Sequence, residues 1–227
     1  MYYVVDTANL EAIKHINEFY PLNGVTTNPS IISKENTQDF IGHMKKIRDI
    51  IGPDKMLCAQ TLQTEADKIV EEGVLMNDII GGDFYLKIPI GEAGLKATME
   101  LKKRGVKVLM TAIFTPAQAL MAAAAGADFV APYVNRLDNV LADGVGVVAS
   151  IVNQFDLYGY NCKCLAASFK NAQQVHECAQ VGCHAVTVSP DIFKMLISHP
   201  LTDVAIAGFE KDWQGVYGNK QLLDLAK

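Results

Sequence analysis

The sequence contains no apolar stretch that approaches the roughly 18–20 residues of a membrane-spanning helix. It also lacks a long basic tract, since Lys102-Lys103-Arg104 is short and closes a helical segment, and the net charge is −5. The N-terminus enters a strand pattern at once, with no positive segment ahead of an apolar one. These absences argue against a membrane protein, a secreted precursor and a nucleic-acid-binding protein. They predict a cytoplasmic location.

Cysteine and histidine lack the spacings of a disulfide framework or a metal centre. The five cysteines are an odd number without paired spacing, and the C-x-C pair of Cys162 and Cys164 has no second pair beside it. The five histidines form neither H-x-H nor H-E-x-x-H. No glycine-rich phosphate turn follows an early strand, where the chain has residues 6–9 (DTAN) instead. We therefore expect no metal and no organic cofactor.

Strand and helix patterns alternate along the whole chain. The expected strands cover residues 2–6, 24–28, 55–61, 84–90, 107–114, 129–134, 163–168 and 185–189. The expected helices cover residues 9–18, 37–51, 64–77, 92–104, 116–125, 142–157, 171–180 and 190–197. This alternation predicts an α/β fold, a closed (β/α)8 TIM barrel formed by residues 1–227 as one domain, with a doubly wound open sheet as the alternative. A further helix at about 202–213 would cover the barrel or a neighbouring subunit.

Lys87 stands alone in the apolar run of residues 84–90 (FYLKIPI), which is typical of a buried strand in a parallel sheet. Burial removes water from an ammonium group and so favours the neutral amine. A neutral amine in a dry pocket attacks carbonyl groups and forms Schiff bases. The alternative is a lysine that reaches solvent from the strand end or that pairs with a carboxylate.

Nearly every expected strand ends in a polar residue, and in a (β/α)8 barrel these ends share one mouth. Taken one at a time, such residues could also be helix caps, backbone-bonded hydroxyls or surface ion-pair partners. A ring of them around one buried lysine favours a catalytic site. The set comprises Asp6, Thr27, Asn28, Gln60, Lys87, Thr111, Tyr133, Arg136, Ser168, Lys170 and Ser189.

The chemistry of these side chains suggests their roles. The residues Arg136, Ser168 and Lys170 offer donors for a phosphate or another tetrahedral oxyanion. Asp6 and Asn28 suit substrate hydroxyls and the proton transfers of carbinolamine formation. Tyr133 is the candidate proton donor and acceptor, while Gln60 and Thr111 could fix a water between them.

Four segments resemble the small transaldolases and fructose-6-phosphate aldolases. They are residues 25–30 (VTTNPS), 86–89 (LKIP), 131–136 (APYVNR) and 166–170 (AASFK), and the resemblance extends to residues 209–215 near the C-terminus. The resemblance implies a class I aldolase barrel with the Schiff base on Lys87. It further implies a ring-shaped homo-oligomer, a pentamer or decamer, with the C-terminal helix on a neighbour. The proton-handling residues would be Asp6, Gln60, Thr111 and Tyr133, and the substrate contacts Asn28, Arg136 and Ser168.

The family contains two activities. Its transaldolases resemble S-A-E on the third strand and S-P-F on the sixth, whereas this chain has residues 58–60 (CAQ) and 131–133 (APY), the aldolase-like pattern. A tyrosine hydroxyl can protonate the enamine that remains after cleavage and so release a three-carbon ketone. The segment 113–119 (IFTPAQA) is closer to the transaldolase pattern.

We therefore predict reversible aldol cleavage of a ketose phosphate such as fructose 6-phosphate, into a dihydroxyacetone unit and an aldehyde such as glyceraldehyde 3-phosphate. The first alternative is transaldolase activity, which passes the same unit between sugar phosphates or their sulfonate analogues. A non-catalytic sugar-phosphate-binding barrel is a second alternative, although it has no reason to bury an unpaired lysine. A phosphosugar isomerase would need a strand-end glutamate or histidine base, which the sequence does not provide.

Overall fold

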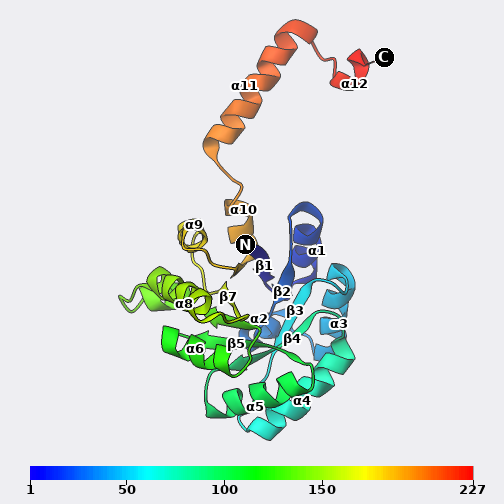
Figure 1. Cartoon of the computed structure of the whole chain (residues 1–227). Helices are drawn as coiled ribbons and strands as arrows, with labels where there is room; N and C mark the ends of the chain where they lie inside the picture. The colour runs from blue at the N-terminus through cyan, green and yellow to red at the C-terminus, as the bar shows by residue number, and fades with distance from the viewer. Residues whose placement is uncertain (227) are drawn as a thin grey trace. The chain divides into compact units, whose positions relative to one another are not determined.

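Eight parallel strands form a closed barrel in the computed structural model, which describes residues 1–226 (Figure 1). Each strand pairs with the next along the chain, and the eighth pairs with the first. The expected (β/α)8 fold is confirmed. The strands are β1 (Tyr2–Asp6), β2 (Gly24–Thr26), β3 (Met56–Gln60), β4 (Phe84–Pro89), β5 (Lys107–Ile113), β6 (Phe129–Pro132), β7 (Lys163–Ala166) and β8 (Ala185–Val188).

Helices surround the strands, and those that were expected occur close to the expected positions (Figure 1). They are α1 (Leu10–Phe19), α3 (Phe40–Ile51), α4 (Ala66–Ile80), α5 (Glu92–Lys103), α6 (Pro116–Ala124), α8 (Gly144–Tyr158), α9 (Ala172–Gln180) and α10 (Pro190–Met195). Three short elements at the barrel mouth were not expected. These are α2 (Pro29–Ile32), the 3-10 turn η1 (Ser33–Glu35) and α7 (Val134–Asp138).

Local capping explains where two of these helices begin. The Asn28 side chain accepts a hydrogen bond from the Ile31 backbone N–H at 3.0 Å, and Pro29 follows as the first residue of α2. At α6, Thr115 and Gln118 form a capping box in which each side chain accepts from the other's backbone N–H. Within the transaldolase-like segment 113–119, Thr115 and Gln118 therefore cap the N-terminus of α6.

Side chains that point into the barrel come from alternate positions of each strand. The register places Gln60 beside Lys87 and Pro89 beside Thr111. The layers of side chains below the carboxyl ends of the strands are apolar. Burying their surface stabilises the fold by roughly 25 cal/mol per Å² of apolar area. Their buried members are Val4, Met56, Cys58, Tyr85, Leu109, Phe129, Ala131, Leu165, Ala167 and Ala185. The layer at the carboxyl ends is polar.

A bulge interrupts β5 beside this polar layer. The pairing with β6 shifts between Met110 and Ile113, and Ala112 has the left-handed φ of +59°. Alanine rarely adopts this backbone conformation, because its Cβ crowds the neighbouring carbonyl. The extra residue lets Thr111 sit at the mouth while Ile113 still pairs with Pro132.

From Lys194 the chain forms a second unit. It contains α11 (Pro200–Tyr217) and α12 (Leu222–Leu225), so the helix expected at 202–213 is longer than predicted. Within this unit the Trp213 indole N–H donates to the Lys220 carbonyl at 2.7 Å, and its ring packs 4.4 Å from that of Tyr217. None of the helices in residues 1–226 is both long and apolar enough to cross a membrane.

Candidate functional site

Lys87 lies within the barrel mouth and is only 3% exposed. Its Nζ donates to the Thr27 carbonyl oxygen at 3.3 Å. No carboxylate of residues 1–226 forms an ion pair with it. Lys87 is therefore buried without an ion-pair partner among these residues, and β4 holds it against the end of β2.

Asp6, the last residue of β1, carries a carboxylate that interacts with the charge of Lys87. The Thr26 hydroxyl donates to Asp6 Oδ1 at 2.7 Å and also contacts the Thr187 hydroxyl. Burial raises the pKa of Asp6 above its ordinary value, while the positive charge of Lys87 opposes that rise. The carboxyl group thus keeps its proton to higher pH than an exposed aspartate.

Tyr133 directly follows β6 at the carboxyl end of that strand. Its hydroxyl is 3.0 Å from that of Thr111, close enough for a hydrogen bond in either direction. The ring is held on two sides: the Arg136 guanidinium lies 4.6 Å from its centre, and the edge-on ring of Phe114 lies 5.5 Å away. These contacts fix the position of the phenol group.

Arg136 and Ser168 extend from neighbouring loops after β6 and β7. Arg136 belongs to α7 and is exposed, whereas Ser168 is half-buried and has the left-handed φ of +61°. The Asn135 N–H donates to the Ser168 carbonyl at 2.8 Å, which joins the two loops. Lys170 is exposed on the same loop as Ser168. Unfavourable backbone conformations such as that of Ser168 are concentrated at functional sites.

Thr27 and Asn28 contribute in different ways. The Thr27 hydroxyl is buried and donates to the Cys58 carbonyl at 2.9 Å, so that hydroxyl is used within the sheet. Thr26 is the neighbour that points inward, toward Asp6. The alternation of side chains along a strand points to Thr26 as the inward residue. The choice of polar residues at the ends of strands pointed to Thr27 instead. Asn28 caps α2 through its Oδ1, and its amide NH₂ has no hydrogen-bond partner among residues 1–226.

A cavity of about 320 Å³ adjoins the mouth between β2 and β3. Thr27, Asn28 and Gln60 form its inner wall, and Phe40 and Leu62 lie among its apolar lining residues. The cavity therefore leaves space beside the carboxyl ends of β2 and β3.

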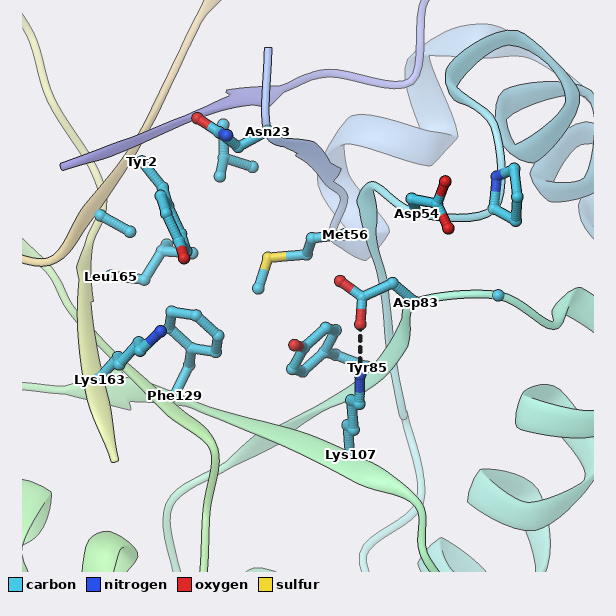
Figure 2. A pocket seen from close by; sticks show the side chains of 14 residues that line it. Tyr2, Asn23, Asp54, Met56, Asp83, Tyr85, Lys107, Phe129, Lys163 and Leu165 are labelled. Atoms are coloured by element: carbon cyan, nitrogen blue, oxygen red, sulfur yellow. Dashed lines mark hydrogen bonds and ion pairs between the residues drawn. The ribbon is translucent and has the colours of Figure 1, made fainter. Parts of the chain in front are cut away.

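The amino ends of the strands open on a larger cavity, of about 700 Å³ (Figure 2). Lys107 pairs there with Asp83 at 2.6 Å, and the Lys163 ammonium lies 5.1 Å from the centre of the Tyr2 ring. None of the residues expected at the site lines this cavity. In barrels this end normally contributes stability, and chemistry occurs at the other end.

The buried Gln174 and the half-buried Asp138 were not anticipated from the sequence as parts of a site. Gln174 and Asp138 are hydrogen-bonded between the β6 and β7 loops. They are 36 positions apart, so only the fold reveals that they meet. Within residues 1–226 no group of three or more His, Cys, Asp or Glu side chains is arranged to hold a metal ion.

A closed (β/α)8 barrel with a buried lysine in a polar mouth defines a barrel enzyme. Comparison with known proteins identifies its kind: residues 3–220 match the family model described as Transaldolase/Fructose-6-phosphate aldolase. The chain belongs to this family and is an enzyme of the aldolase or transaldolase type.

Relatives from three bacteria match over nearly their whole length. A probable transaldolase of Clostridium acetobutylicum is 40% identical over 213 residues, covering 94% of this chain and 97% of that protein. A probable transaldolase of Symbiobacterium thermophilum is 39% identical over 214 residues, with coverage of 94% and 97%. One of Brevibacillus brevis is 39% identical over 213 residues, with coverage of 94% and 98%.

One solved structure, named "Native KDPGal structure", is similar in fold. It is 13% identical in sequence and has a TM-score of 0.59, covering 83% of this chain and 82% of the other. At this level of identity the likeness concerns the barrel fold alone.

Proposed function

We propose that this enzyme reversibly cleaves a ketose phosphate such as fructose 6-phosphate through a Schiff base on Lys87. The supporting observation is the buried, unpaired amine of that residue at the barrel mouth. The amine attacks the C2 carbonyl and loses water to form an iminium. A base then takes the proton of the C4 hydroxyl, and the C3–C4 bond breaks with the iminium as electron sink. This step forms an enamine and releases an aldehyde such as glyceraldehyde 3-phosphate.

Asp6 is proposed to move protons while the Schiff base forms and is hydrolysed. A carboxyl group is most useful for this when its pKa lies close to the working pH, and burial raises the pKa of Asp6 in that direction. The hydrogen bond from Thr26 fixes one of its oxygens. Asn28, whose NH₂ group is available, is proposed to bind a substrate hydroxyl.

Tyr133 is proposed to protonate the enamine that remains after cleavage, which releases dihydroxyacetone. Its hydroxyl is oriented by Thr111, and Gln60 lies beside Lys87 in the strand register. Thr111 and Gln60 would hold the water that relays the proton.

Arg136 and Ser168 are proposed to bind the phosphate of the substrate, with Lys170 adding positive charge at the rim. A guanidinium group matches the geometry of a tetrahedral oxyanion, and Arg136 is free of carboxylate partners among residues 1–226. Thr27 is proposed to act through its carbonyl, which accepts the hydrogen bond of Lys87. A sulfonate would suit the same donors.

We further propose a single functional domain that assembles into a ring of five or ten copies in the cytoplasm. The C-terminal helix would pack on a neighbouring copy, because apolar residues of α11 such as Phe209 are exposed in the single chain. All five cysteines are free thiols, which supports a reducing compartment. Burial raises the pKa of the Cys58 thiol to about 12, so that thiol is unreactive.

The Schiff base can be tested by borohydride reduction in the presence of fructose 6-phosphate, followed by peptide mapping. The reduced adduct is expected on Lys87. Lys87→Met should abolish turnover and leave the fold intact, because it removes the amine at nearly constant volume. Circular dichroism checks the fold, and Lys96→Met, which changes an exposed lysine of α5, is the matched control. An adduct on another lysine, or turnover of the Lys87 variant within about tenfold of wild type, would refute the assignment.

Transaldolase activity is the second candidate. It is favoured by the names of the three relatives, each a probable transaldolase. In that reaction the enamine waits for a second aldehyde instead of taking a proton. The two candidates share every step up to the enamine, so they differ only in what Tyr133 and its neighbours do next.

A further inference from the structure

Gln174 of α9 is buried between the loops that follow β6 and β7. Its Oε1 accepts from the Lys170 N–H at 2.8 Å, and its Nε2 donates to Asp138 Oδ2 at 2.6 Å. Asn135 Oδ1 lies 3.4 Å from the same nitrogen. One side chain thus connects the β7 loop to both ends of α7.

This bridge requires an amide. The oxygen of Gln174 must accept from one loop while its nitrogen donates to the other. The second oxygen of Asp138 is also occupied, because it accepts from the Gly144 N–H at 3.0 Å. A hydrogen bond to a charged group is stronger than one between neutral groups, and a buried partner left without its bond is destabilising because it stays desolvated. A carboxylate at position 174 would face that of Asp138.

The bridged segments are those that carry the proposed phosphate ligands. Arg136 lies on α7 between Asn135 and Asp138, and Ser168 precedes Lys170 by two residues. The Asn135 N–H also donates to the Ser168 carbonyl at 2.8 Å. The two segments are therefore joined both by this backbone hydrogen bond and by the side chain of Gln174. Holding these segments together fixes the spacing between the guanidinium and hydroxyl groups.

We propose that Gln174 is a positioning residue that holds Arg136 and Ser168 at the spacing a substrate phosphate requires, with Asp138 as its partner. The proposal rests on the assignment of those two residues to phosphate binding. Neither Gln174 nor Asp138 touches the substrate; both act through the loops they connect. A purely structural role would instead affect phosphorylated and unphosphorylated substrates alike.

The decisive variants first break the hydrogen bonds of Gln174 and then restore them with donor and acceptor exchanged. Gln174→Glu removes the donor and opposes two carboxylates, whereas Gln174→Met removes both hydrogen bonds without adding charge. Combining Gln174→Glu with Asp138→Asn restores a complementary pair. The new carboxylate can accept from the Lys170 N–H and from the new amide, whose oxygen can still accept from the Gly144 N–H. Gln173→Glu, on the exposed neighbour in α9, is the matched control for charge.

The measurement compares kcat/KM for glyceraldehyde 3-phosphate and for unphosphorylated glyceraldehyde as acceptors of dihydroxyacetone. For each single variant at position 174, kcat/KM for glyceraldehyde 3-phosphate is expected to fall about tenfold, because KM rises. The value for unphosphorylated glyceraldehyde should change little. The double variant should recover to within about threefold of wild type, and the control should match wild type. Equal losses for both aldehydes, or no recovery in the double variant, would overturn the proposal.

Hydrogen–deuterium exchange separates the bridge from the proposed function. Peptides covering residues 133–144 and 168–171 should exchange faster in Gln174→Met than in wild type, and at the wild-type rate in the double variant. Unchanged exchange would refute the bridge even if phosphate binding is correct. A wild-type enzyme that does not prefer the phosphorylated aldehyde would instead refute the phosphate assignment, whatever the exchange shows.

Discussion

In the proposed reaction, the fate of the enamine depends on the hydroxyl group of Tyr133. Its hydrogen bond with Thr111 and its contacts with Arg136 and Phe114 hold it in one position. A group held in this way can deliver a proton without reorganisation, which is the requirement for efficient acid catalysis. Losing the hydroxyl while keeping the ring should therefore affect protonation and spare the preceding cleavage.

Tyr133→Phe is expected to slow release of dihydroxyacetone by about a hundredfold, a typical contribution of general acid catalysis, with much less effect on transfer to erythrose 4-phosphate. Adding Gln60→Glu should move the ratio further toward transfer. The two rates are measured on one donor. A wild-type enzyme that transfers much faster than it releases dihydroxyacetone would favour transaldolase, and an unchanged ratio in Tyr133→Phe would place the proton elsewhere.

Asp6 makes stability depend on pH. Because burial raises its pKa above the ordinary 3.8, the folded protein holds the proton more tightly than the unfolded chain. Its contribution to folding is therefore greatest at acidic pH and falls as the pH rises through the raised pKa. Asp6→Asn keeps the acceptor for Thr26 but removes this titration.

The melting temperature of Asp6→Asn relative to wild type is expected to rise between about pH 4 and about pH 8. Differential scanning fluorimetry across this range measures it. Asp78→Asn, which changes an exposed carboxylate, should show no such trend. A difference that is constant with pH would mean that the charge of Lys87 cancels the effect of burial, and one that falls with pH would mean that this charge outweighs burial.

At the scale of an element, the bulge in β5 sets the direction of Thr111. Ala112 has a left-handed backbone, which glycine adopts freely and β-branched residues strongly resist. Ala112→Gly should leave the free energy of unfolding unchanged or raise it by up to about 1 kcal/mol. Ala112→Val should lower it by about 1–3 kcal/mol and reduce turnover, because the bulge must shift.

Urea unfolding of the two variants measures the first effect, and steady-state kinetics the second. The bulge would have no role in placing Thr111 if the valine variant lost stability but kept full activity.

Most strands could be predicted because burial on both faces makes them continuous apolar runs, as in residues 84–90 around Lys87. The short helix α7 was missed because its five residues carry too little periodicity to be distinguished from a loop. At the mouth, the lone lysine in an apolar run predicted the buried position of Lys87, and the end of a strand predicted the position of Tyr133. Gln174 was missed because its partners come from a distant loop, and the inward Thr26 was passed over for its neighbour.

At the scale of the whole molecule, the proposed homo-oligomer can be tested through α11. Its exposed apolar side chains include Leu201, Val204, Ile206, Phe209 and Val216. Phe209→Glu is expected to shift the particle mass toward the monomer, because it places a charge on the apolar surface proposed to contact a neighbour. Light scattering measures the mass, and Glu210→Gln is the control. A wild-type monomer, or an unaltered mass in Phe209→Glu, would contradict this arrangement.

The chain has one tryptophan, and Trp213 lies in α11, outside the eight-stranded barrel. Its ring packs on Tyr217 and its indole N–H bonds the Lys220 carbonyl. Intrinsic tryptophan emission therefore reports on the C-terminal unit and is silent about the barrel, which contributes most of the circular dichroism signal. If subunits separate before they unfold, the emission change will precede the loss of ellipticity during denaturation. A single sample followed by both signals would then yield two transitions, one for dissociation and one for the barrel.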